Sequence, residues 1–303
     1  MSPLVLCSPK PSHPTVPTLT LTPLQPAALP ALQQLRDDLL APHTQPGLAE
    51  ELTDVARGHG QHACLAWRDG RVVGCAGWVL LGIEQDGCGY GAPVVAADQE
   101  VASLLIARVT AMASEAGAKR LRISAVAAES AKQAALLAAG FQPVFEFVHW
   151  ALPLPIAGSA TLAGGLRSLP YAEIDWPALR ACYAQCFKQV PNAPVPDEDA
   201  MREEWSAADW TVSRVLVDEL GHYQAFLLIS GTEVDAVGVM PALQGRGLAA
   251  ALYAQAGEVL QRRGVHHLHA MVASSNSASM ALHARLGGYE HQPRRTVYQL
   301  SLC

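Results

Sequence analysis

The segment 233–249 reads EVDAVGVMPALQGRGLA, and the rest of the 303-residue chain can be interpreted from it. Its first part is an apolar run that ends at Pro241, which cannot donate to a sheet ladder and so predicts the end of a strand. A short turn with Gly245 and Gly247 follows, and from Leu248 apolar residues recur at helical spacing. The free N–H groups of a first helical turn, at the positive end of the helix dipole, attract anions. The order of strand, glycine turn and helix therefore predicts a phosphate-binding site.

The polar residues of this turn resemble a known family signature. Gln244, Gly247 and Ala249 match the pattern Q/R-x-x-G-x-G/A of the GNAT superfamily, the acyl-CoA-dependent N-acyltransferases. The resemblance implies that the turn holds the pyrophosphate of acetyl-CoA, while the strand before it holds the pantetheine arm. The residues that it implies for binding acetyl-CoA are Val237, Val239, Gln244, Gly245, Arg246, Gly247, Leu248, Ala249 and Asn276.

A second motif near the end of the chain supports the resemblance. Asn276, Ser279 and His283 are spaced as in the family pattern N-x-x-A-x-x-x-Y, and Tyr289 follows two glycines as in its G-F/Y ending. Asn276 is expected to contact the pantetheine or phosphate region and also to cap a helix. His283 stands where the family carries the Tyr that protonates the departing CoA thiolate. Neutral imidazole is a poor acid at pH 7, so a packed or solvated His283 is the alternative, with Tyr289 or water as the acid.

Glu233 is the candidate general base. It lies eleven positions before Gln244, a spacing that resembles that of the catalytic Glu in histone-type GNAT members. An ammonium substrate must lose a proton before its nitrogen attacks a thioester carbonyl, and a carboxylate can accept that proton directly or through water. Asp235 has the same side-chain parity on a strand and is the second candidate. For both residues, a surface carboxylate without a catalytic role is the alternative.

The first half of the chain resembles a second, degenerate copy of the same domain. Its pattern of strands and helices matches a complete GNAT domain, but residues 97–102 read ADQEVA where the phosphate turn should fall. Asp98 and Glu100 would repel a pyrophosphate by on the order of 4 kcal/mol for each close pair of charges. We interpret both residues as N-terminal helix caps and expect no binding of acetyl-CoA there.

An internal repeat supports this duplication. Gly117 and Gly264, Leu121 and Leu268, and Glu129 and Asn276 are pairs that each lie 147 positions apart. The sequence therefore predicts an α+β fold of two tandem GNAT domains, each a mixed, mostly antiparallel twisted sheet flanked by helices. The expected boundaries are a loose N-terminal segment at 1–17, a degenerate GNAT domain at 18–154, a linker at 155–165 and the domain that binds acetyl-CoA at 166–303.

Composition excludes several other classes of function. The net charge of −6 argues against a nucleic-acid or anionic-membrane partner, and no run of about 18 apolar residues predicts a membrane span. Seven cysteines without a C-x-x-C pair fit reduced thiols in the cytoplasm. His266 should face away from His267 and His269 on a strand, so no metal site is predicted.

The function predicted from these features is transfer of an acetyl group from acetyl-CoA to a primary amine of a small molecule or peptide. The alternative is a non-catalytic acyl-CoA sensor or interaction module. We expect a cytoplasmic monomer or homodimer. No motif identifies the amine.

Overall fold

The computed structural model describes residues 18–40, 47–80, 83–156, 162, 164–188, 190 and 193–302. The predicted N-terminal segment 1–17 and most of the predicted linker 155–165 lie outside these residues. No helix in these described ranges is long and apolar enough to cross a membrane.

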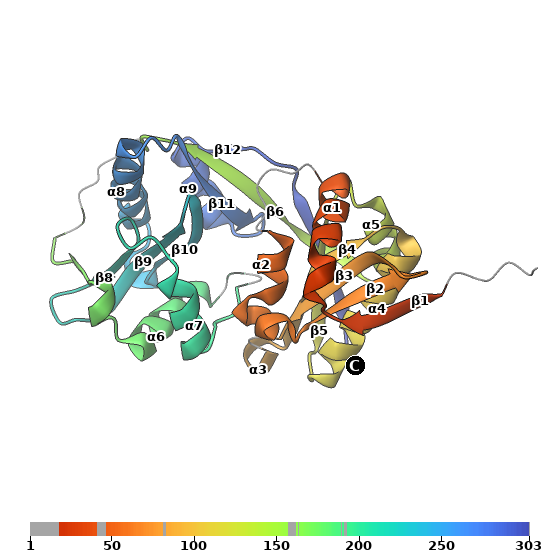
Figure 1. Cartoon of the computed structure of the whole chain (residues 1–303). Coiled ribbons are helices and arrows are strands. Elements are labelled where there is room, and N and C mark those ends of the chain that lie inside the picture. Colours follow the sequence, from red (N-terminus) through yellow and green to blue (C-terminus); the bar gives the residue numbers. More distant parts are fainter. Residues whose placement is uncertain are drawn as a thin grey trace, which may run out of the picture.

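The first half of the chain alternates strands and helices as predicted (Figure 1). Its strands are β1 (Leu19–Pro23), β2 (Ala63–Arg68), β3 (Arg71–Val79), β4 (Cys88–Ala96), β5 (Arg120–Val126) and β6 (Gln142–Pro153). Its helices are α1 (Leu29–Leu39), α2 (Leu48–Thr53), α3 (Ile83–Asp86), α4 (Gln99–Glu115) and α5 (Ser130–Ala138), and a 3-10 segment, η2, spans Val55–Gly60.

The second half repeats this order. Its strands are β7 (Arg167–Ser168), β8 (Arg214–Val217), β9 (Tyr223–Ser230), β10 (Glu233–Val239), β11 (His267–Ala273), β12 (Tyr289–Glu290) and β13 (Arg295–Ser301). Its helices are α6 (Trp176–Phe187), α7 (Glu198–Ser206), α8 (Leu248–Arg262) and α9 (Ser277–Arg285), and a 3-10 turn, η4, spans Pro241–Leu243.

The strands form one continuous 13-stranded sheet, in which the two halves exchange their last strands. The order is β1-β2-β3-β4-β5-β13-β6-β11-β10-β9-β8-β7, with β12 paired to β6. β13 therefore lies between two strands of the first half, and β6 continues into the second half by pairing with β11. Among the strands that the structure describes, only β4–β5 and β10–β11 are parallel, as expected for mixed, mostly antiparallel sheets. Neither half completes its sheet without a strand from the other.

Helices cover both faces of the sheet, and hydrophobic periodicity explains which residues they bury. In α8, Leu248, Leu252, Ala256 and Leu260 are buried at four-residue spacing. In the first half, α1 and α2 cover one face, while α4 and α5 cover the other. In the second half, α6 and α7 bury Trp205 against Phe226 of β9, while α8 and α9 lie on the opposite face.

Candidate functional site

The predicted glycine turn joins β10 to α8 through η4. Gly245 and Gly247 adopt left-handed backbone angles, with φ of +75° and +80°, and a Cβ atom added at either one would meet nothing within 4 Å. Gly247 is the N-cap of α8 and supplies no side-chain acceptor. The first N–H groups of α8, from Leu248 onward, are therefore left for an external acceptor in open space. This arrangement suits an anion such as a pyrophosphate.

The exposed side chains of the turn support the same site. Gln244 is exposed, and its Nε2 donates to the carbonyl of Val239 at 3.0 Å, which ties the turn to the end of β10. Arg246 is also exposed, so its positive charge is available to an anion at the turn. Ala249 lies in the first turn of the helix and is partly buried.

The equivalent turn in the first half is closed by the protein's own carboxylates. Asp98 caps α4 by accepting the N–H of Val101 at 3.0 Å, so the interpretation as a helix cap holds for this residue. Arg68 lies 2.6 Å from Asp98 and 2.9 Å from Glu100. The hydrogen bond from Arg68 is the main reason that the pKa of Asp98 lies below its usual value. An added phosphate would meet a capped helix and two carboxylates.

Beside the glycine turn, β10 diverges from β11. The two strands pair only at Glu233 with His269 and at Val234 with Ala270, whereas β10 runs on to Val239 paired with β9 alone. The edge of β10 from Val237 to Val239 therefore has no paired strand on its β11 side. Unpaired strand groups at such an edge can bind an extended ligand. This is where the family resemblance expects the pantetheine arm.

The first half has the same divergence, but an ion pair fills it. β4 and β5 pair only as far as Gly91, and Val94 lies three residues further, as Val237 lies three residues after the last β10–β11 pair. The buried ammonium of Lys132, on α5, donates to the carbonyl of Val94 at 3.0 Å and pairs with the buried Glu129. The repeat of 147 positions puts Ser279 where Lys132 stands. The first copy therefore holds its own cation against the strand edge.

Glu233 lies on the sheet face opposite α8. Val234 packs in the core against α8, and strand alternation directs Glu233 the other way. The β10–β9 register shifts between Val234 and Ala236, a bulge that leaves Asp235 unpaired. Glu233 and Asp235 are both exposed at the surface. The protein removes part of the water around each carboxyl group, and this desolvation raises both pKa values. The charge of Asp235 raises the pKa of Glu233 further. A carboxylate with a raised pKa is a stronger base.

A third carboxylate, that of Glu204, interacts with Asp235. Glu204, on α7, has its pKa raised to about 7 by burial first and then by the charges of Asp235 and Asp54. Asp54 belongs to the first half, where it caps η2. Glu204 still reaches solvent. The negative charges that act on Glu204 thus come from both halves, and sequence reasoning identified neither Glu204 nor Asp54.

His283, the predicted general acid, is enclosed. It is 1% exposed, its Nδ1 lies 2.8 Å from the carbonyl of Ser279, and its Nε2 lies 2.9 Å from the hydroxyl of Tyr253. Because a carbonyl only accepts, Nδ1 carries the proton, and Nε2 accepts from Tyr253. Burial lowers the pKa of His283, which keeps it neutral. The geometry therefore argues against proton donation by His283 and favours the packed alternative.

Tyr289, the alternative acid, lies on a strand that is not adjacent to the strand of Glu233. Tyr289 is 49% exposed, with its hydroxyl 3.4 Å from Nε2 of His267, and β6 and β11 separate its strand, β12, from β10. Asn276 caps α9 by accepting the N–H of Ser279 at 3.1 Å, as its capping interpretation requires. In the part of the chain that the structure describes, no group of three or more His, Cys, Asp or Glu side chains is arranged to hold a metal ion.

Comparison with known proteins agrees with this geometry. Residues 176–288 match the family model described as Acetyltransferase (GNAT) family. A GCN5-related N-acetyltransferase from Sphaerobacter thermophilus is similar in fold, with a TM-score of 0.69 at 19% identity, over 93% of this chain and 95% of that one. A tandem GNAT protein from the clavulanic acid biosynthesis pathway has a TM-score of 0.63 at 16% identity, over 94% and 98% of the two chains.

A third similar structure is a putative acetyltransferase from Pyrococcus horikoshii, with a TM-score of 0.67 at 10% identity, over 97% of this chain and 94% of that one. At these identities the structural likeness shows the fold, while the family model identifies the domain of the second half. No functionally curated protein matches the sequence significantly.

Proposed function

We propose that the chain is an N-acetyltransferase of the GNAT superfamily, because residues 176–288 match the GNAT family model and the whole chain shares its fold with a tandem GNAT protein. The reaction moves the acetyl group of acetyl-CoA to a primary amine. The single observation that carries this proposal is the second half's uncapped glycine turn beside an unpaired strand edge, two features that the first half closes with Asp98 and Lys132.

The donor site uses backbone groups more than side chains. The first N–H groups of α8 and the exposed Arg246 receive the pyrophosphate. The edge of β10 from Val237 to Val239 receives the pantetheine arm by hydrogen bonds of the kind that a neighbouring strand would make. Asn276 stays a candidate contact, because its side chain also caps α9.

The chemical step needs a base and a proton for the leaving group. Glu233 takes one proton from the ammonium, directly or through water, and the freed amine attacks the thioester carbonyl. A C–N bond forms, the nitrogen loses its second proton to water, and the C–S bond breaks as the tetrahedral intermediate collapses. Water protonates the departing thiolate, because His283 holds its only proton in a hydrogen bond to Ser279. The raised pKa of Glu233 makes it a better base than a free carboxylate.

An activity assay tests this assignment. Release of free CoA from acetyl-CoA is followed with a panel of primary amines, for the native chain and for Glu233→Gln. Loss of a general base is expected to lower kcat by about 10²- to 10⁴-fold while the Kd for acetyl-CoA stays unchanged. Asp235→Asn is the matched control on the same strand, and a small effect is expected there.

Two outcomes would contradict this proposal. An unchanged kcat in Glu233→Gln would remove Glu233 from the mechanism. Binding of acetyl-CoA without acetylation of any amine in the panel would favour the alternative of a non-catalytic sensor.

A further inference from the structure

The middle of the sheet presents a partly exposed face, which we call the central face. It is the side of β13, β6 and β11 opposite α9, and Phe147, His149, Met271 and Arg295 lie on it. The register pairs Arg295 with Phe147 and Met271 with His149, and paired residues share a face. Val148 and Val272 pack on the other side. Met271 is 53% exposed, although its strand lies inside the sheet.

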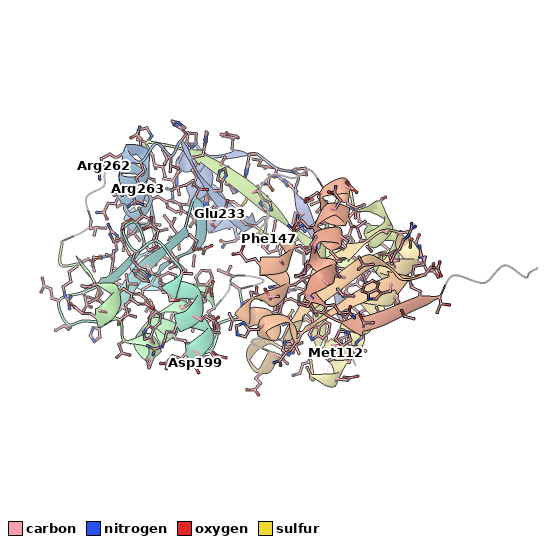
Figure 2. The ribbon with its side chains drawn as sticks, in the orientation of Figure 1. Met112, Phe147, Asp199, Glu233, Arg262 and Arg263 are labelled. Carbon is pink, nitrogen blue, oxygen red and sulfur yellow. The ribbon has the colours of Figure 1, made fainter. Side chains whose placement is uncertain are left out.

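Glu233 lies at one end of this face. Glu233 is paired with His269 of β11, which lies two residues before Met271. The side chains of Glu233 and His269 therefore point to the central face, as that of Met271 does. Figure 2 shows Glu233 and Phe147 on the inner side of the molecule, between the two halves. The candidate base of the second half and a side chain from the first half therefore line the same surface.

Arg295 lies at the other end and has no anionic partner. It is half-buried, and among the described residues it makes no ion pair and no side-chain hydrogen bond. Its neighbour Arg294 instead lies 2.7 Å from Glu290 and 2.9 Å from Glu146. The charge of Arg295 acts on His149 and on Lys132, which is itself paired with Glu129. A half-buried guanidinium without an ion pair of its own lacks the pairing that such a charge normally has.

We propose that Arg295 binds an oxyanion group of the amine acceptor, so that the acceptor carries an amine at one end and a carboxylate or phosphate at the other. This inference rests on the proposed N-acetyltransferase function. A guanidinium group binds a carboxylate or a phosphate through two parallel N–H···O bonds. The class of acceptor is therefore defined by a terminal oxyanion of either kind. The amine end meets Glu233, where the charge of Asp235 adds to a negative potential that favours an ammonium.

The spacing of the two ends limits the length of the acceptor. β11 and β6 separate β10 from β13, which is three strand spacings, or roughly 14 Å. Along the strands, the registers separate Glu233 from Arg295 by four residues, or roughly 13 Å. The Cα atoms are thus roughly 19 Å apart on a flat sheet, and the two side chains cover part of that.

An α-amino acid, with both groups on one carbon, is too short to bridge these ends. An extended peptide spans roughly 3.5 Å per residue, so a peptide of about three residues would cover what the side chains leave. Phe147 and Met271 lie between the ends and offer apolar contacts to the body of such an acceptor. The imidazole rings of His149 and His291 also lie here, 6.5 Å apart. The favoured class is a short peptide or another long amine with a terminal oxyanion.

A matched peptide series tests this inference. Three tripeptides share one sequence and a free N-terminal amine, and they end in a carboxylate, a phosphonate or a neutral amide. CoA release gives kcat and KM for each, and binding of acetyl-CoA is measured separately. The native chain is expected to prefer the anionic peptides over the amide by about tenfold to a hundredfold in kcat/KM. The comparison of carboxylate with phosphonate identifies the oxyanion.

Variants show whether Arg295 causes the preference. Arg295→Gln should lose it, with the Kd for acetyl-CoA unchanged, whereas Arg295→Lys should keep part of it. Arg294→Gln, which removes the neighbouring paired arginine, is the control and should keep all of it.

Each contrary result has a distinct meaning. An undiminished preference in a folded Arg295→Gln variant, or no acetylation of any of the peptides by a chain that binds acetyl-CoA, overturns this inference and leaves the proposed function standing. Absence of acetyl-CoA binding overturns the proposed function itself.

Discussion

Nε2 of His283 lies 2.9 Å from the hydroxyl oxygen of Tyr253, and both side chains are almost completely buried. Burial raises the pKa of Tyr253 and lowers that of His283, so both groups are neutral at pH 7. This bond joins α8, which begins at the glycine turn, to α9, which Asn276 caps. The pair therefore holds together the two helices that follow the candidate donor site.

Removing the hydroxyl of Tyr253 tests whether the pair is structural. Tyr253→Phe leaves Nε2 of His283 without a donor and is expected to lower the free energy of unfolding by about 1–2 kcal/mol. Urea unfolding measures the loss. Tyr298→Phe is the control, because the hydroxyl of Tyr298 has no hydrogen-bond partner among the described residues. A kcat that falls a hundredfold at unchanged stability would instead assign the pair to proton transfer.

The raised pKa of Glu204 makes the stability of the folded chain depend on pH. The folded state raises the pKa of Glu204 from its usual value of 4.5 to about 7. The folded state therefore binds this proton more tightly, and the resulting stability is present below about pH 4.5 and lost as the pH rises through about 7. Glu204→Gln should raise Tm above that of the native chain at pH 8 and leave it nearly unchanged at pH 4.5. An equal shift at both pH values would show that charge is not the cause.

Removing the ion pair of Lys132 and Glu129 tests whether this pair stabilises the first half, where it occupies the edge of β4. Lys132→Met leaves Glu129 as a buried charge without a partner and is expected to cost about 3–5 kcal/mol of stability. The double variant Lys132→Met/Glu129→Gln should lose clearly less, because no charge stays unpaired. A denaturant-based double-mutant cycle measures the coupling. Additive losses would mean that the two residues do not act as a pair.

Sequence reasoning recovered the features that depend on local pattern. The glycine turn, the helix that follows it and the capping role of Asp98 each depend on residues within one short segment. Glu233 was placed on β10 for the same reason. Its function as a base stays a prediction, as do the roles of the predicted donor-site residues.

The exchange of the last strands between the two halves could not be predicted from local sequence patterns. The alternation of β6 and β13 shows which side chains face a core, but it does not show which half supplies the neighbouring strand. The roles of Arg295 and Glu204 depend on that arrangement, because their surroundings come from both halves. Lys132 carries no motif, and its internal position depends on the divergence of β4 from β5. His283 matched a family position, yet Tyr253 encloses it from a helix that the motif does not include.

The most direct test of the account is calorimetric titration of acetyl-CoA into the native chain and into Gly247→Asp. The variant puts a carboxylate and a strained left-handed backbone at the start of α8, where the pyrophosphate is expected. Gly264→Asp is the matched control, because Gly264 also has a positive φ, of +82°, and open space around it, but follows the other end of α8. We expect one site in the native chain and in the control, and none in Gly247→Asp. Two sites in the native chain, or one that survives in Gly247→Asp, would contradict the account.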